Sequence, residues 1–207
     1  MALDTYANLQ TAIGSTLNRS DLTATIPDFI TLAEADMTAR ISHWRMEKRA
    51  NATASAQFVG LPTDFVEMIR IGSDTQNEHR IEYVSMPEMQ QMRENTADAT
   101  GTPQFWTFTD GQIELFPTPN ATYTLEIVYL SALDALSATN TTNWVLTRHP
   151  DAYLYGALIH SAPFLHDDAR TSIWAALYQT ALDGIAASDK RGRSGGTGLR
   201  MRIKGLR

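Results

Sequence analysis

The spacing of apolar residues changes twice along this chain, and this change decides which fold classes remain open. Between residues 27 and 44 apolar residues recur three and four positions apart, which is the period of one helix face. Between residues 105 and 130 they alternate with polar residues, which is the period of a strand. After residue 150 the helical spacing returns. Helices on both sides of a strand region predict an α+β protein.

Two helices are predicted before the strand region. The first covers residues 4–17 with Asp4 as its N-cap, and the second starts at Pro27, because proline suits the first helical position. The second helix is expected to turn one apolar face to the core. The residues of that face are Phe29, Leu32, Ala33, Met37, Ile41 and Trp44, with Glu34, Asp36 and Arg40 on other faces.

Two further helices are predicted after the strand region. One covers residues 150–166, although Pro163 should kink it or end it early. The other starts from a cap at Asp167 or Asp168 and runs to about residue 190. Its inward residues are predicted to be Ile173, Trp174, Leu177, Ala181 and Ile185.

The segment between these helices is predicted to form antiparallel strands. Asp110-Gly111 separates two alternating segments, and this pair favours a type I′ hairpin turn, which needs positive φ at both positions. Residues 51–59 are rich in β-compatible residues, and a short helix is expected at residues 87–95. The other expected strands cover residues 65–71, 80–84, 105–109, 112–116 and 123–130. We expect these strands to build a sheet or a small barrel.

Charge divides the chain more sharply than its net value of −6 indicates. Residues 190–207 hold seven Lys and Arg and no acidic residue. The other 189 residues hold 10 Lys and Arg against 23 Asp and Glu, a net charge of −13. An acidic body with a tail of +7 indicates that the tail is an interaction arm rather than part of the fold.

The end of this tail has the pattern of a single strand on a tether. The glycine-rich residues 192–198 have the composition of a flexible linker, and beyond them apolar residues alternate with cations. An extended segment of this kind suits β-augmentation, in which main-chain hydrogen bonds attach it to a partner protein. The predicted partner-binding residues are Leu199, Arg200, Met201, Arg202, Ile203, Lys204, Leu206 and Arg207.

A nucleic-acid-binding arm is the alternative interpretation of the same tail. Counterion release from phosphates explains the cations, and this hypothesis predicts DNA binding with a steep salt dependence. It does not explain the apolar alternation, and the tail has no aromatic residue for stacking on bases. A body with a net charge of −13 would also repel the same DNA.

The residues that carry chemistry form no catalytic or metal-binding motif. Cysteine is absent, and the five histidines lack the spacing of a zinc site. His160 and His166 beside Asp167 and Asp168 favour helix-capping acids next to ordinary histidines over a weak surface metal site. The strand carboxylates Glu67, Glu82 and Glu126 have the pattern of a solvated sheet face.

We therefore predict a protein that is not an enzyme and has no cofactor, metal or small-molecule substrate. A hydrolase with a carboxylate pair in a cleft is the competing hypothesis, although the sequence selects no such pair. The first ten residues lack the pattern of a signal peptide, and we expect no membrane-spanning segment.

Seven segments carry a resemblance that covers nearly the whole chain in order. They are residues 61–67, 80–85, 101–107, 113–119, 142–156, 162–168 and 199–205. The most specific are residues 142–156, Thr-Asn-Trp-Val-Leu-Thr-Arg-His-Pro-Asp-Ala-Tyr-Leu-Tyr-Gly, and the basic tail. Together they resemble the head-to-tail adaptor (head completion) proteins of tailed bacteriophages, which are related to the podophage tail accessory factors.

This resemblance implies a homo-oligomeric ring, usually of twelve copies, that docks beneath the portal protein and offers its lower rim to a tail or nozzle protein. It implies that the C-terminal arm reaches the portal, and that DNA passes through an acidic channel without specific binding. It places the protein in the neck of the virion after assembly in the host cytoplasm, with no membrane partner.

These arguments combine into one predicted organisation. The fold class is α+β: a helical core of two N-terminal and two C-terminal helices, an inserted antiparallel β-sheet or barrel domain, and an extended C-terminal arm. Residues 1–47 and 148–190 are expected to form the ring-building helical domain, and residues 48–147 the β domain. Residues 191–207 are expected to form the flexible, basic, portal-binding arm.

Overall fold

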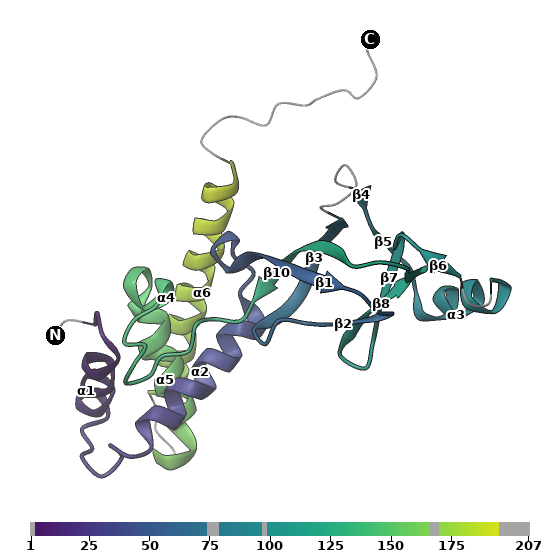
Figure 1. Cartoon of the computed structure of the whole chain (residues 1–207). Helices are drawn as coiled ribbons and strands as arrows, with labels where there is room; N and C mark the ends of the chain where they lie inside the picture. Colours follow the sequence, from purple (N-terminus) through teal and green to yellow (C-terminus); the bar gives the residue numbers. More distant parts are fainter. Residues whose placement is uncertain (1–2, 74–78, 97–98, 166–169, 195–207) are drawn as a thin grey trace. The chain divides into compact units, whose positions relative to one another are not determined.

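The computed structural model describes residues 3–73, 79–96, 99–165 and 170–194 (Figure 1). The chain divides into two compact units, one formed by Met1–Arg45 with Leu133–Arg207 and the other by Met46–Ala132. We call the first the helical unit and the second the β unit, because the described strands all lie in the second. The mixed α+β class predicted from the apolar spacing is confirmed.

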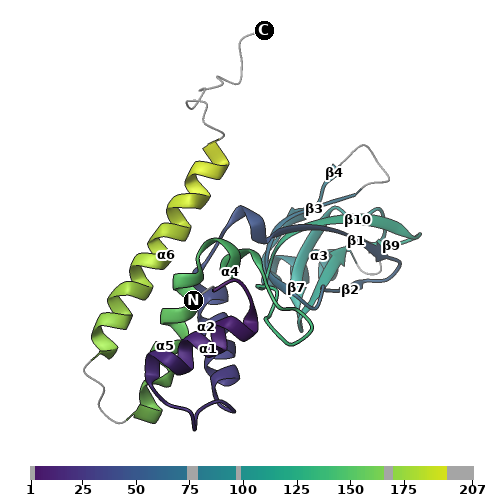
Figure 2. The same cartoon turned by 90° about the vertical axis from the view of Figure 1, so that its left-hand side faces the viewer.

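The helical unit is built around one central helix. Helix α5 (Pro150–Leu165) packs against α2 (Ile26–Arg40) and α6 (Thr171–Ser194), and it also contacts α1 (Tyr6–Leu17) and the short α4 (Trp144–Arg148). Figure 2 shows α5 and α6 side by side. The buried residues of this unit include Leu9, Ile13, Phe29, Ile30, Met37, Leu146, Tyr153, Leu158, Trp174 and Ile185.

A glycine lets the three main helices approach closely. At Gly156 of α5, an added Cβ would lie 3.1 Å from the Ala33 Cβ of α2 and 3.1 Å from the Tyr178 ring of α6. Since protein interiors are already close-packed, a larger residue would force the helices apart. The Tyr178 hydroxyl also donates a hydrogen bond of 2.8 Å to Asp36, which ties α6 to α2.

The N-terminal helices differ from the prediction in their ends and faces. Helix α1 is capped by Thr5, whose hydroxyl accepts a backbone N–H of the first turn, and not by Asp4. The buried face of α2 is rotated, since Leu32 is 49% exposed whereas Glu34 is buried. Helix α2 also ends before Trp44, which lies in a separate 3₁₀ turn, η1 (Trp44–Met46), and is exposed.

The C-terminal helices differ as well. Helix α5 continues through Pro163, which lies in its last turn, and ends at Leu165. Two residues of α6 that were predicted to point inward, Ile173 and Leu177, are 59% and 38% exposed. The buried residues of α6 are Trp174, Tyr178, Ala181, Leu182 and Ile185.

Helix α6 is longer than the apolar spacing predicts. It runs to Ser194 and so includes residues 192–194, which sequence analysis assigned to a linker. The predicted caps of this helix, Asp167 and Asp168, lie outside the described residues. Helix α4 was not predicted, because its five residues are too few for an apolar period to show.

The β unit contains open sheets. One sheet has the strand order β1-β10-β3-β4 with antiparallel neighbours, and a second has the order β2-β8-β7-β5, in which β5 pairs parallel to β7. A further parallel pair joins β6 and β9. The strands are β1 (Glu47–Ala54), β2 (Phe58–Gly60), β3 (Phe65–Ser73), β4 (His79–Arg80), β5 (Glu82–Tyr83), β6 (Thr100–Gly101), β7 (Phe105–Thr109), β8 (Gln112–Phe116), β9 (Thr118–Pro119) and β10 (Tyr123–Ser131).

This topology corrects two expectations. The described strands form no closed barrel, because both four-stranded sheets keep edge strands. They are not wholly antiparallel either, since β5 pairs in parallel with β7 and β6 pairs in parallel with β9. The predicted hairpin is confirmed: Asp110 and Gly111 join β7 to β8 with φ values of 50° and 70°.

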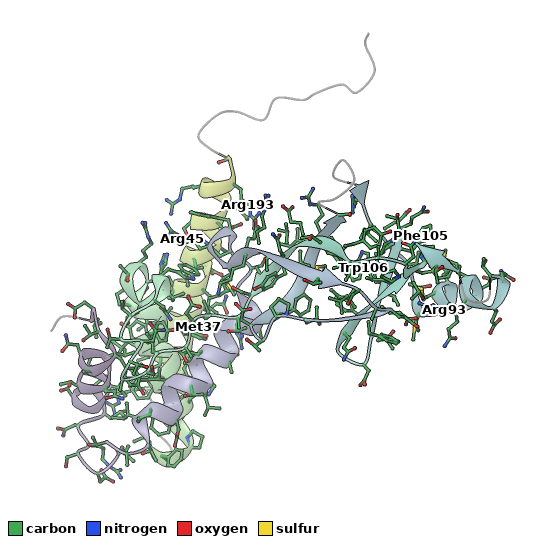
Figure 3. All side chains as sticks on the ribbon, in the orientation of Figure 1. Met37, Arg45, Arg93, Phe105, Trp106 and Arg193 are labelled. Carbon is green, nitrogen blue, oxygen red and sulfur yellow. The ribbon has the colours of Figure 1, made fainter. Side chains whose placement is uncertain are left out.

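The β unit has its own core and one attached helix. Helix α3 (Met86–Asn95) begins with a capping box of Ser85 and Glu88. Arg93 of α3 donates to the buried Glu114 of β8 at 2.7 Å and to the Leu115 carbonyl oxygen at 2.8 Å (Figure 3). The core residues include Ile71, Ile81, Trp106, Ile113, Leu115, Leu125, Ile127 and Tyr129.

Candidate functional site at the base of the arm

All eight predicted partner-binding residues, Leu199, Arg200, Met201, Arg202, Ile203, Lys204, Leu206 and Arg207, lie outside the described residues. What the structure does show is where the arm starts. The last turns of α6 and the segments that pack on them form a well-defined site, which we build up below.

A carboxylate on α6 fixes the chain segment that leaves α2. Asp189 accepts a hydrogen bond of 2.7 Å from the Trp44 backbone N–H, and its two oxygens accept Arg193 Nε at 3.0 and 2.8 Å. Partial burial acts to raise the pKa of Asp189, but these hydrogen bonds outweigh it and lower the pKa below its usual value. Asp189 is therefore a charged anchor that is already fully engaged.

His43 sits beside this anchor with both ring nitrogens in use. Ser188 Oγ donates to the Ile185 carbonyl oxygen at 2.8 Å, so at 3.1 Å it accepts from His43 Nε2. His43 Nδ1 accepts the Arg45 backbone N–H at 3.1 Å, which assigns the proton to Nε2. Burial lowers the pKa of His43 below its usual value, and the charges of Arg45 and Arg193 add to this against the opposing effect of Asp189, so the ring is mostly neutral at pH 7.

Aromatic rings stack around His43. Its ring lies 4.6 Å from the Trp144 ring at 27°, and 5.6 Å from the Trp44 ring. The Arg45 guanidinium lies 4.5 Å from the centre of the Trp44 ring, within the range of a cation–π contact. Trp44 also packs on α6, because a Cβ added at Gly192 would lie 2.9 Å from its Cδ1 atom. Two tryptophans from distant parts of the sequence thus meet at the end of α6.

These side chains enclose a pocket of about 340 Å³, which we call the root pocket. Its lining is His43, Trp44, Arg45, Trp144, Arg148, His149, Ser188, Arg191 and Gly192. Figure 3 labels Arg45 and Arg193 at this end of α6. The lining holds three arginines and no carboxylate. Burial lowers the pKa of His149, and the charges of Arg148 and Arg191 lower it further, while the Asp151 carboxylate, which lies outside the lining, acts to raise it.

The β unit has a second hollow of different character. A groove of about 380 Å³ runs along β3 and is lined mainly by apolar and aromatic residues. Its exposed members include Val66 (40%), Ile69 (47%), Tyr83 (57%) and Phe108 (38%). The Trp106 ring makes an edge-to-face contact with Tyr83 and another with Phe108, each with ring centroids 5.0 Å apart. We call this the β3 groove.

The described residues contain neither a metal-binding cluster nor a membrane-spanning helix. Among them, no three His, Asp or Glu side chains gather as a metal site would require. His166, Asp167 and Asp168, considered beside His160, lie outside the described residues. No helix in the described part of the chain is both long and apolar enough to cross a membrane.

The three strand carboxylates that the sequence singled out are either exposed or paired across strands. Glu67 and Glu82 are exposed. Glu126 on β10 pairs with Arg49 on β1 at 3.1 Å and with Arg70 on β3. These cross-strand pairs agree with the predicted solvated face rather than with a catalytic pair.

Sequence reasoning missed the root pocket. It placed Trp44 in the apolar face of a helix and assigned no role to Arg45, Arg148 or Arg191 individually. The available signal was local: a His-Trp-Arg run at residues 43–45, and Trp144 and Arg148 at the i, i+4 spacing of one helix face. Nothing in the sequence says that these runs meet.

Comparison with known proteins adds one finding. A family model described as the SU10 adaptor protein matches residues 4–202, and so covers elements of both units. No curated protein matches the chain.

Proposed function

The chain belongs to the SU10 adaptor protein family, and from this premise we propose that it is a structural adaptor that joins the head of a tailed phage to its tail. The observation that carries the proposal is the match over residues 4–202, which includes the helical unit, the β unit and part of the arm. In this role the protein is a virion component of the neck, it needs no cofactor, and its work is assembly rather than catalysis.

In the proposed assembly, copies of the chain form a ring, of twelve subunits, beneath the portal protein. A head-to-tail contact that repeats by rotation closes into such a ring, and repetition multiplies a modest affinity. Ile173 and Leu177 support the proposal, because they are exposed apolar residues one turn apart on α6. We assign them to the contact between neighbouring copies.

The arm is proposed to hold the ring to the portal. Helix α6 ends at Ser194, so its base is fixed by the Asp189 anchor while the residues beyond it extend toward the partner. Nine residues, 199–207, reach about 30 Å when extended. Main-chain pairing and three apolar side chains give the affinity, and the cations meet an acidic portal surface.

The acidic body suits the proposed DNA channel. With a net charge of −13 outside residues 190–207, the body repels a polyanion rather than binding it, so DNA passes without specific contact. An adaptor also needs a contact on its far side. The β3 groove, with its exposed aromatic residues, is the surface that we propose for the downstream tail or nozzle protein.

Removal of the arm tests the proposal. We expect the full-length chain to co-sediment with the cognate portal, and a chain lacking residues 199–207 to remain folded and to stay in the supernatant. A chain that keeps these residues but carries L199S, M201S and I203S should also fail to bind, because it loses the three apolar side chains while every cation of the arm is retained. Normal portal binding by the shortened chain would refute the role of the arm.

A nucleic-acid-binding arm remains the alternative. It predicts that the full-length chain shifts DNA with an affinity that falls steeply with salt and that the portal has no effect. The uncharged substitutions L199S, M201S and I203S separate the hypotheses, because a phosphate-binding arm depends chiefly on Arg200, Arg202 and Lys204, which these variants keep. DNA binding without portal binding would favour this alternative over the adaptor.

A further inference from the structure

The root pocket has a cationic lining that no described carboxylate neutralises. Arg45, Arg148 and Arg191 form no salt bridge with any residue in the described part of the chain. Two acids lie close to lining residues: Asp151 acts on His149, and Asp189 is already bound by Arg193 and by the Trp44 backbone N–H. Three guanidinium groups around one hollow therefore have unused hydrogen-bond donors.

The aromatic residues give the same pocket an apolar wall. Trp44 and Trp144 flank the neutral His43 ring, and the Trp44 indole N–H has no acceptor among the described residues. The Trp44 indole packs against the α6 backbone at Gly192. A ligand that fits has an anionic head for the arginines and a short apolar stem for the indoles.

We propose that the root pocket binds a carboxylate of an acidic peptide segment of the protein to which the arm docks. Arginine binds carboxylates through paired N–H donors, and a Glu or Asp side chain supplies both the head and the stem. The volume of about 340 Å³ lies at the lower end of the range for pockets that enclose a ligand, about 300–1,000 Å³. The inference rests on the proposed function only for the identity of this partner.

A peptide fits the pocket better than a nucleic acid. Nucleic-acid binding proteins spread cations along a groove that follows the phosphate backbone. Here the cations gather around one open pocket, and the chain outside residues 190–207 carries a net charge of −13. A peptide that presents one or two carboxylates avoids this repulsion.

Binding of a hexaglutamate peptide to the full-length chain tests the proposal, with tryptophan fluorescence as the signal because two indoles line the pocket. The pocket variant R148Q/R191Q removes two exposed cations from the lining. The matched control R19Q/R40Q removes two cations of the same unit that lie outside the lining. A third variant replaces Arg200, Arg202, Lys204 and Arg207 with glutamine, which leaves the pocket intact.

We expect the wild type, the control and the arm variant to bind the peptide with similar Kd values. The Kd of the pocket variant should be higher by a factor of about ten or more. Unchanged circular dichroism would show that the pocket variant folds. Equal binding by the pocket variant, loss of binding in the arm variant alone, or tighter binding of an oligothymidylate at the pocket would each overturn the proposal. Peptide binding without portal binding would refute the proposed partner and leave the pocket assignment standing.

Discussion

At the scale of single residues, a buried polar network organises the helical unit. Glu34 Oε1 accepts the Leu136 backbone N–H at 2.8 Å and the Tyr153 hydroxyl at 2.9 Å. Asn143 caps α4 through the Leu146 N–H and donates through its amide to the Tyr153 oxygen. Because Tyr153 is fully buried, this network connects α2, α4 and α5 where no water competes.

Removal of the Tyr153 hydroxyl should weaken this network measurably. In Y153F, Glu34 and Asn143 each lose a buried partner, so we expect the free energy of unfolding to fall by about 1–3 kcal/mol. The Tyr155 hydroxyl on the same helix forms no hydrogen bond with the described residues, so Y155F is the matched control with little expected change. Urea unfolding of the three proteins measures the difference, and equal midpoints for Y153F and wild type would contradict this account.

Burial of Glu34 also predicts a pH dependence. Burial raises the pKa of Glu34 above 4.5, because the hydrogen bonds from Leu136 and Tyr153 only partly compensate. At pH values between 4.5 and the raised pKa, the folded state therefore binds more protons than the unfolded state. The contribution of Glu34 to stability is present below this range and falls as the pH rises through the folded-state pKa.

The variant E34Q isolates that contribution. The free energy of unfolding of the wild type minus that of E34Q should decrease as pH rises from 4 to 7. Glu88 is the opposite case, since hydrogen bonds from Ser85 lower its pKa. The contribution of Glu88 to stability is present above pH 4.5 and is lost as the pH falls through the folded-state pKa. The free energy of unfolding of the wild type minus that of E88Q should therefore increase as pH rises. If the stability of the wild type instead rose relative to that of E34Q between pH 4 and 7, the raised pKa of Glu34 would be contradicted.

The face of α2 shows what residue-level reasoning misses. Polarity alone placed Glu34 outward, yet it is buried, because the Leu136 backbone N–H and the Tyr153 hydroxyl both donate to its Oε1 atom. Those partners lie more than a hundred residues away in sequence. A buried carboxylate of this kind cannot be recognised until its distant donors are known.

At the scale of elements, strands were easier to predict than helix faces. The Asp110-Gly111 turn requires positive φ at two positions, and this local demand located β7 and β8 correctly. The face of α6 was predicted only in part: Trp174, Ala181 and Ile185 are buried as expected, but Tyr178 and Leu182 are buried where Ile173 and Leu177 were predicted. Long amphipathic helices offer more than one plausible apolar stripe, and tertiary packing selects among them.

Two glycines of α6 give opposite predictions. An added Cβ at Gly184 meets no atom within 4 Å, so G184A should stabilise the chain by about 0.5–1 kcal/mol through helix propensity. At Gly192 the same methyl group would contact the Trp44 ring, so G192A should gain little or lose stability and should shift the fluorescence of Trp44. Thermal unfolding and emission spectra of both variants check this. Equal stabilisation by the two substitutions would mean that Trp44 does not pack on α6.

At the scale of the whole molecule, charge and chain order could be predicted whereas the candidate site could not. The excess of cations after residue 190 is visible in the sequence, as is the strand region between two helical regions. The root pocket is not, because its lining comes from residues 43–45, 144–149 and 188–192. Only the tertiary fold of the helical unit brings these three segments around one pocket.

The central claim is that the chain is an adaptor that adds to the portal as a ring. Mass photometry of the purified portal, alone and with an excess of the chain, tests this most directly. With a subunit mass of 23.0 kDa, we expect a single discrete complex whose added mass equals one copy of the chain for each portal subunit. The double variant I173D/L177D should instead occupy only some of the portal subunits and give a mixture of complex masses. A portal whose mass is unchanged by the wild-type chain would contradict the adaptor account.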